Sequence, residues 1–308
     1  MKHLFVINPK AKQIKGHVAT FVKNINDFFL SYPWIKYDIH LTRWRRDAEG
    51  FIQRYVSDSQ EMVKIYALGG TGTLFEVVNG VIGLPNVQIT AQPLGALNSF
   101  IRSFGEDKLE QFCSLRNLFF SKIITIDALR CGKKYCISKS FIGILAKSSQ
   151  VYDAFSGIIP LSVSKCLLLS GLYEVMSKTI HSQYYTIEID GNSYSGEYIS
   201  IMVANEPYCG PGMTPAQGAC PTDGLLDVYL VKAASRFTIL RMIYDYEYGH
   251  HEKWPNNIFH LRGKSVSISS DEYVPINMDG ELFYDKSIQY DIIPQAIDFA
   301  CPETIGHV

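Results

Sequence analysis

A glycine-rich segment in the first third of the chain is the first pattern with chemical meaning. Gly69-Gly-Thr-Gly-Thr73 follows an apolar run and precedes a helical pattern. Glycines let backbone N–H groups approach a phosphate closely, and a helix N-terminus favours negative charge. The spacing is not that of the P-loop, because no Gly-Lys-Ser/Thr follows, and it is not the dinucleotide fingerprint. Phosphate binding and an ordinary tight strand-to-helix turn both remain open.

Two further loops belong to the same half of the chain. Asn8-Pro9-Lys10 follows the first apolar run, and Pro93–Phe100 follows the fourth. In a parallel sheet such loops lie at the carboxyl ends of the strands, where ligands usually bind. Three loops at one edge are more informative than any one of them, although each alone could be a simple turn.

Carboxylates mark two turns in the second half. Asp223 lies in a turn just before a predicted strand, and Asp279 and Glu281 flank Gly280. Phosphoryl transfer uses a carboxylate to orient or deprotonate the acceptor hydroxyl, and Mg²⁺ to neutralise the phosphates. On spacing alone, however, Asp-Gly-Glu is more often a plain hairpin turn.

The first half of the chain alternates strand and helix patterns. This alternation predicts parallel βαβ units with right-handed crossovers, and so an α/β fold with a Rossmann-like N-terminal domain over residues 1–124. The strands are expected at 4–7, 37–41, 62–68 and 87–90, and the helices at 18–29, 48–56 and 74–82.

The pattern changes after about residue 122. Short strands dominate and predict a mainly antiparallel β-sandwich domain over residues 125–290, with a hairpin turn at Gly191. Residues 291–308 form a C-terminal segment that we expect to pack back on the first domain. The strands are expected at 123–129, 135–141, 184–190, 198–204, 226–231 and 266–269, and the helices at 164–177 and 237–246.

Composition narrows the class of protein. The chain has 308 residues, of which 47% are hydrophobic and 19% charged, with a formal net charge of −1. These values exclude a disordered chain and a charge-rich coiled coil, and they argue against a general nucleic-acid binder. No apolar run approaches the ~18 residues that span a bilayer. The seven cysteines form no C-x-x-C pair, so we expect a cytoplasmic protein with reduced thiols.

A basic cluster lies directly after Thr42. Arg43, Arg45 and Arg46 flank Trp44, a combination that suits an anionic membrane surface. A solvated helix start is the favoured alternative, because charge elsewhere in the chain is balanced. Peripheral contact with a membrane therefore stays open.

Taken in order, these segments resemble the diacylglycerol kinase catalytic-domain family, which includes soluble bacterial lipid kinases and, more distantly, sphingosine and ceramide kinases. The resemblance runs from Asn8 to Glu281 and includes Thr42 and the Cys-Pro-x-Asp-Gly-x-Leu-Asp segment at 220–227. Members of this family have a nucleotide-binding α/β domain and a C-terminal β-sandwich domain. They transfer the γ-phosphate of ATP to a lipid hydroxyl.

The resemblance implies cofactors and roles for residues. It implies ATP and Mg²⁺ as cofactors and a lipid such as diacylglycerol as substrate. Glu281 would be the proton acceptor, supported by Asp279. Asp223 would hold a Mg²⁺ with the backbone carbonyls of Cys220 and Leu225. The implied ATP contacts are Asn8, Thr42, Gly69, Gly70, Thr71, Gly72, Thr73, Gly95 and Asn98.

Three positions depart from the family pattern. Thr71 replaces the usual aspartate of the glycine loop, and Ala96 and Ser99 replace a threonine and an aspartate in the next loop. A nucleotide- or lipid-binding protein with impaired catalysis is therefore the main alternative to a lipid kinase, and a kinase for a soluble substrate such as NAD is a weaker one. We expect ATP and lipid as partners and no nucleic acid, and a homodimer stays open.

Overall fold

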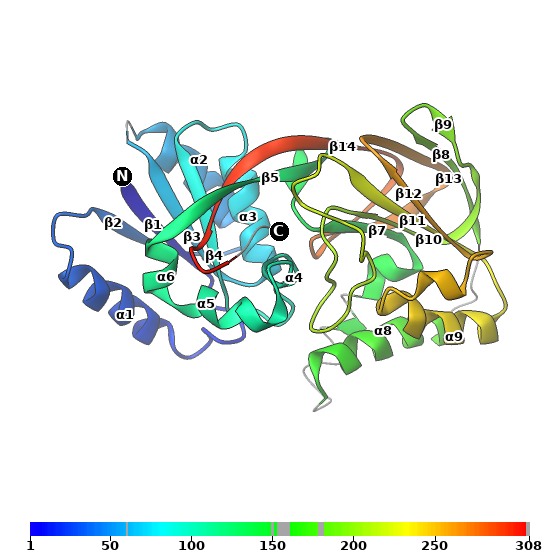
Figure 1. Ribbon diagram of the computed structural model, residues 1–308, viewed down its shortest axis with the longest axis horizontal. Helices are drawn as coiled ribbons and strands as arrows, with labels where there is room; N and C mark the ends of the chain where they lie inside the picture. The colour runs from blue at the N-terminus through cyan, green and yellow to red at the C-terminus, as the bar shows by residue number, and fades with distance from the viewer. Residues whose placement is uncertain (60, 149–150, 153–160, 178–181, 306–308) are drawn as a thin grey trace. The chain divides into compact units, whose positions relative to one another are not determined.

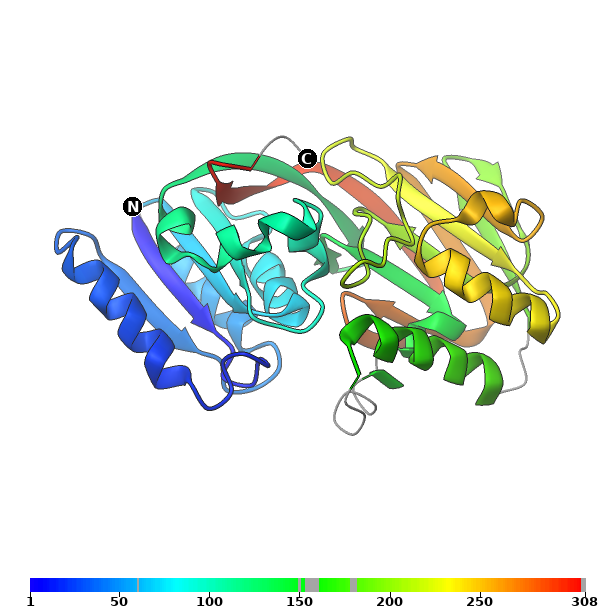
Figure 2. The ribbon, with the colours of Figure 1, turned by 60° about the horizontal axis from the view of Figure 1, so that its bottom comes forward.

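A computed structural model describes residues 1–59, 61–148, 151–152, 161–177 and 182–305 (Figures 1 and 2). The chain divides into two compact units. The first unit comprises Met1–Ile126 together with Gln295–Val308, and the second comprises Asp127–Pro294. Each unit is described separately below.

A parallel sheet organises the first unit. Its strand order is β14-β4-β3-β1-β2, and Phe299 of β14 pairs with Ile89 of β4. Every residue of β3 is buried, as expected for a central strand with both faces covered. The strands are β1 Lys2–Ile7, β2 Tyr37–Leu41, β3 Val63–Gly69, β4 Val87–Pro93 and the end of β14 Glu281–Pro302.

Helices cover both faces of this sheet. Right-handed crossovers from β1 outward to β2, and then back to β3, place the two connecting helices on opposite faces. α1 Val18–Leu30 therefore lies with α5 Leu109–Cys113 and α6 Leu115–Phe119 on one face (Figure 1). The other face carries α2 Asp47–Ser57 and α3 Thr71–Val81, and Gly80 of α3 packs closely against Ile52 of α2. The short helices α4 Ser99–Arg102 and η1 Glu106–Lys108 follow β4.

The second unit is built from antiparallel strands. One run has the order β12-β11-β10-β7-β13-β14, and β8 pairs with both β10 and β13. β5 Ser121–Cys131 begins in the first unit and ends in this one. The strands that follow are β6 Lys134–Cys136, β7 Lys139–Gly143, β8 Gln183–Ile189, β9 Asn192–Ser193, β10 Gly196–Ala204, β11 Leu226–Lys232, β12 Ile258–Gly263 and β13 Ser265–Met278. Its helices are η2 Ile144–Lys147, α8 Val163–Ser177, α9 Arg236–Glu247 and η3 His251–Lys253.

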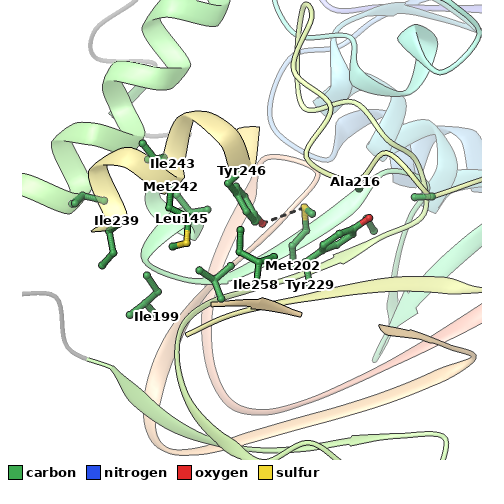
Figure 3. Packing of buried hydrophobic residues seen from close by; sticks show 14 residues of the cluster. Leu145, Ile199, Met202, Ala216, Tyr229, Ile239, Met242, Ile243, Tyr246 and Ile258 are labelled. Carbon is green, nitrogen blue, oxygen red and sulfur yellow. Dashed lines mark hydrogen bonds between the residues drawn. The ribbon is translucent and has the colours of Figure 1, made fainter. Parts of the chain in front are cut away.

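An apolar core joins α9 to the sheet of the second unit. Tyr246 points from α9 toward Met202 on β10, and its hydroxyl lies 3.8 Å from the Met202 sulfur (Figure 3). Met242 of the same helix lies beside Leu145 in this cluster. α8 packs beside α9, and a β-carbon on Gly171 of α8 would lie 2.8 Å from the end of the Ile243 side chain of α9. Tyr246 therefore belongs to the core of this unit.

The predicted fold class is confirmed, with one strand prediction wrong. The expected strand at 135–141 is two strands, β6 and β7, because the N–H groups of Ile137 and Ser138 turn toward the Asp279 carboxylate. The hairpin at Gly191 forms as expected, with positive φ at Asp190 and Gly191. The sequence patterns did not predict the strands β12 and β14 or the helices between residues 99 and 119, all of which the structure contains.

The C-terminal segment contributes both pairing and packing to the first unit. Phe299 is fully buried, and its ring lies 5.1 Å from that of Phe100 and 5.6 Å from that of Phe104. Within the described residues no helix has the length and apolarity required to span a membrane.

We expect Phe299→Ala to destabilise the protein by about 3–5 kcal/mol, because it leaves a cavity in this aromatic cluster. Phe237→Ala is the matched control, since Phe237 is 82% exposed, and it should change the free energy of unfolding by less than about 0.5 kcal/mol. Urea unfolding of both variants measures the difference. Equal stabilities would contradict the packing described for Phe299.

Candidate functional site

The carboxyl edge of the first sheet gathers the predicted nucleotide-binding residues. The Asn8 side-chain N–H₂ donates to the Thr73 hydroxyl at 3.2 Å, which joins the β1 loop to the glycine loop. The Leu94 N–H donates to the Gly69 carbonyl at 2.8 Å, which joins the glycine loop to the loop after β4. The Thr42 N–H donates to the Ile7 carbonyl at 2.9 Å. Three loops thus form one continuous surface along this edge.

Close packing accounts for three of the glycines at this edge. A β-carbon on Gly95 would lie 2.4 Å from the α-carbon of Gly70, so the two loops touch through their backbones. A β-carbon on Gly69 would lie 2.2 Å from the Thr73 hydroxyl. Nothing lies within 4 Å of the corresponding position on Gly72, which is the second residue of α3. Gly72 is therefore the glycine at which a ligand could approach the backbone without displacing protein atoms.

Asn98 shapes the loop after β4. It adopts a left-handed conformation with φ of 50°. Its side-chain oxygen accepts the Gly95 N–H at 3.2 Å, and its amide donates to the carbonyls of Pro93 and Gly95 at 3.1 and 3.0 Å. These bonds assign Asn98 a part in holding Gly95 against Gly70. Its predicted contact with ATP stays a prediction.

The carboxyl edge of the first sheet carries no carboxylate on either glycine-containing loop. The Thr71 hydroxyl is buried, has no hydrogen-bond partner among the described residues, and lies beside a cavity of about 10 Å³ lined by Leu74 and Phe100. Glu76, on α3, accepts the backbone N–H groups of Arg46 and Ala48 at 2.9 and 3.1 Å. Its carboxylate therefore serves the N-terminus of α2.

The basic segment after Thr42 is partly neutralised within the protein. The Arg43 N–H donates to the Asp47 carboxylate at 2.9 Å, and its guanidinium pairs with the same side chain at 3.4 Å. Burial opposes ionisation of Asp47, but the hydrogen bonds from Arg43 outweigh it and lower the Asp47 pKa. The same guanidinium lies 4.3 Å from the ring centre of Trp44, which is exposed.

The Asp-Gly-Glu segment of the second unit is the turn between β13 and β14. Asp279 and Gly280 have φ of 48° and 91°, and Met278 pairs with Glu281 across the hairpin. The Asp279 carboxylate is buried and accepts the N–H groups of Ile137, Ser138 and Lys139 at 3.2–3.4 Å. Burial raises the pKa of Asp279 to about 6. Asp279 therefore fixes the turn, and Glu281 follows it at the first position of β14.

Asp223 has protein partners where a metal ion was expected. One of its oxygens accepts the Leu225 N–H at 3.0 Å, and the other forms an ion pair with Arg262. Arg262 also reaches the fully buried Asp227, at 3.3 Å. The described ranges contain no cluster of three or more His, Cys, Asp or Glu side chains that could hold a metal ion. These residues do not present the open oxygen cage that Mg²⁺ prefers, and an ion held with the carbonyls of Cys220 and Leu225 would compete with Arg262.

An apolar cavity lies within the second unit. It has a volume of about 30 Å³ and is lined by residues of α9 and of the sheet, including Ile199, Met242 and Tyr246 (Figure 3). This volume is close to that of one water molecule. A lipid chain would enter here only if α8 or α9 moved.

Sequence reasoning missed three buried charges beside these turns. Lys139 and Glu206 form a buried ion pair, and the buried Asp127 accepts the Gly224 N–H at 2.7 Å. The lysine had a signal, because it interrupts the otherwise uncharged segment 135–141, which was predicted as a strand. The two acids had none, since their partners are distant in sequence.

Two sequence families match complementary parts of the chain. The model of the "Diacylglycerol kinase catalytic domain" matches residues 2–131, and that of the "YegS C-terminal NAD kinase beta sandwich-like domain" matches residues 169–301. The chain thus combines a diacylglycerol kinase catalytic domain with a YegS-type β-sandwich domain. Its first unit corresponds to the catalytic-domain match and its second to the β-sandwich match.

Individual relatives of this chain are distant. Proteins of Staphylococcus aureus strains N315 and Newman, both named "Putative lipid kinase", are 24% identical over 267 residues, covering 84% of this chain and 85% of theirs. The crystal structure of a "putative diacylglycerol kinase" from Bacillus anthracis strain Sterne has a TM-score of 0.78 at 22% identity and covers 99% of this chain and 98% of its own. A second diacylglycerol kinase structure from that strain has a TM-score of 0.71 at 20% identity. At these identities the structures show a shared fold.

We expect Gly72→Ala to separate ligand contact from packing. Because the position is open and helical, the substitution should stabilise the free protein by up to about 1 kcal/mol, yet weaken ATP binding if phosphate meets this backbone. Gly95→Ala is the packing control, and overcrowding should destabilise it by about 1–3 kcal/mol. Calorimetric ATP titration and thermal unfolding test both variants. Unchanged ATP affinity in Gly72→Ala would place phosphate elsewhere.

We expect Arg262→Gln to strengthen divalent-ion binding at Asp223, because it removes the competing guanidinium. Mg²⁺ should then raise the melting temperature more in this variant than in the parent, at constant ionic strength, as ligand linkage requires. Adding Asp223→Asn to Arg262→Gln is the control and should abolish the gain. The prediction is wrong if Mg²⁺ raises the melting temperature of the parent by the same amount and Asp223→Asn abolishes that rise. The ion would then displace Arg262 from Asp223 without help from the substitution.

Proposed function

We propose that this protein is an ATP- and Mg²⁺-dependent lipid kinase, which transfers the γ-phosphoryl group to a hydroxyl of diacylglycerol or a related amphiphile. The observation that carries the proposal is the edge at which Asn8, the Gly69–Thr73 loop and Gly95 meet. Backbone amides at a helix N-terminus suit a triphosphate. The match of residues 2–131 to the diacylglycerol kinase catalytic domain supports the same function.

The first unit would hold the nucleotide. The start of α3, at Thr71 and Gly72, would receive phosphate oxygens, and Asn8 would keep the Thr73 hydroxyl in place. Thr42 lies beside the same edge through its bond to Ile7. The exposed Lys10 and Lys12 next to Asn8 add positive charge to this end of the sheet. Together these groups would bind and orient the polyphosphate.

The second unit would supply the proton acceptor. Glu281 would take the proton of the acceptor hydroxyl as its oxygen attacks phosphorus, while Asp279 holds the turn. Mg²⁺ bound with ATP would neutralise charge on the phosphates. Since neither glycine-containing loop offers a carboxylate, that ion would be held by phosphate oxygens and water. We expect the lipid to be met at a membrane surface, with the protein in the cytoplasm.

Impaired catalysis remains the second candidate, and one observation favours it. Thr71 is turned toward an apolar cavity, and Ser99 is buried. Neither position supplies the acid that would organise a metal ion in the transition state. A protein of this kind would bind nucleotide or lipid with little turnover. The double variant Thr71→Asp/Ser99→Asp should then have lipid kinase activity that the parent lacks. Its melting temperature is measured as well, because both positions are enclosed and the new carboxylates could destabilise the fold.

Glu281→Gln should lower kcat for lipid phosphorylation by about 10²–10⁴-fold, the usual contribution of a positioned general base. The affinity for ATP should be retained, because Glu281 lies outside the nucleotide-binding unit. The assay follows labelled phosphate from ATP into a panel of lipids in mixed vesicles.

Glu272→Gln is the matched control for this substitution. It is an exposed glutamate on the neighbouring strand β13, and it should keep the parental rate. No transfer to any lipid by the parent, together with tight ATP binding, would refute the kinase and leave the impaired-binding alternative. Equal transfer with and without vesicles would instead favour a soluble acceptor.

A further inference from the structure

A buried ion pair lies directly behind the Asp279 turn. The Lys139 side chain is 5% exposed and that of Glu206 is fully buried. The Lys139 ammonium donates to Glu206 and to the Tyr208 carbonyl, and the other Glu206 oxygen accepts the Tyr208 N–H at 2.7 Å. A buried ion pair is weak evidence for stability, because desolvation offsets its attraction. We therefore expect the ion pair to select one arrangement of the backbone beside the Asp279 turn, rather than to add stability.

The same lysine is bonded to Asp279 through its main chain. The Lys139 N–H donates to the Asp279 carboxylate at 3.2 Å, and the Lys139 carbonyl accepts the Asp279 N–H at 3.2 Å. Asn205, the residue before Glu206, binds the other side of this segment. Its side chain donates to the Ile137 carbonyl at 3.1 Å, and its N–H donates to the Ser138 carbonyl at 2.8 Å. Residues 137–139 are thus held between the turn and the segment after β10.

We propose that Lys139 is a positioning residue for the Glu281 proton acceptor: its main chain holds the Asp279 carboxylate, and its ammonium, anchored on Glu206, fixes the segment that does so. The inference rests on the proposed function, because it takes Glu281 as the proton acceptor. Removal of the anchor would let residues 137–139 move and would loosen the turn from which Glu281 projects.

The charges around Asp279 give this arrangement a measurable signature. After burial, the bond and positive charge of Lys139 favour the ionised form of Asp279, whereas the negative charge of Glu206 opposes it. The other titratable groups near these residues are the buried Cys136 on β6, next to Asp279, and Glu247 on α9 and Cys209, next to Lys139. Removal of Lys139 should therefore raise the titration midpoint of Asp279, and removal of the Glu206 charge should lower it.

The test begins with a measurement that needs no enzymatic activity. Carboxyl ¹³C spectra of the aspartates, with Asp279 assigned from Asp279→Asn, follow its titration in the parent, Lys139→Met and Glu206→Gln. Midpoints that move in opposite directions, up in Lys139→Met and down in Glu206→Gln, support the proposal. Midpoints that stay or move together overturn it. If Lys139→Met does not fold, the direction in Glu206→Gln decides alone.

Kinetics of the double variant Lys139→Met/Glu206→Gln complete the test. It removes both charges and keeps an acceptor for Tyr208, so it should fold with a melting temperature close to that of the parent. Its kcat should fall by about tenfold to a hundredfold, the cost of a misplaced reacting group, while KM for ATP stays within about twofold. A parental kcat overturns the proposal. If the parent itself has no kinase activity, the proposed function is refuted instead. The titration of Asp279 then still shows whether Lys139 and Glu206 act on that carboxylate.

Lys64→Met is the control for loss of a buried lysine. Lys64 lies in the first unit and donates to the Leu118 carbonyl at 2.6 Å. This variant should lower the melting temperature and leave the Asp279 titration and kcat unchanged. An equal fall of kcat in Lys64→Met would show that the double variant reports general destabilisation, and would overturn the assignment to Lys139.

Discussion

The contact between Gly70 and Gly95 is the constraint on which the carboxyl edge of the first sheet depends. Their backbones approach so closely that a β-carbon on Gly95 would lie 2.4 Å from the Gly70 α-carbon, and one on Gly70 would lie 3.1 Å from the Gly95 α-carbon. Asn98 maintains the contact from one side by folding its amide back into its own loop, and the Leu94–Gly69 hydrogen bond maintains it from the other. Of the glycines in these two loops, Gly72 is the one whose β-carbon position is open. The two loops therefore offer peptide amides, hydroxyls and the Asn98 amide to a ligand, and no acids.

The second unit uses an opposite device at the Asp-Gly-Glu turn. There a buried carboxylate, Asp279, collects three backbone N–H groups, and the strand that supplies them is interrupted to do so. The buried Lys139–Glu206 ion pair lies next to this interrupted segment, since Lys139 is its last residue. In one unit small residues create the site geometry by close approach. In the other, ionic groups create it by hydrogen bonding.

Much of this architecture could be predicted from local patterns. The βαβ alternation and the glycine loops identified the first unit, because parallel strands bury continuous apolar runs and place their loops at one edge. The break at Ile137 and Ser138 was not predictable, because its cause is Asp279, about 140 residues away. The same is true of the Asp223–Arg262 pair, which depends on the register of β11 with β12. The lysine at position 139 was visible in the sequence, but its partner Glu206 was not.

The route of the chain through the two units bears on how the protein is synthesised and how it can be divided. The first unit needs Phe299, which pairs with Ile89 and packs on Phe100 and Phe104, yet these partners leave the ribosome about 200 residues earlier. A nascent fragment ending near Ile126 therefore exposes an unpaired strand edge and an aromatic cluster, both hazards for aggregation. The first unit completes its fold only after the whole second unit has been translated. A fragment that stops at the end of the first domain therefore lacks Phe299 and is a poor substitute for the intact first unit.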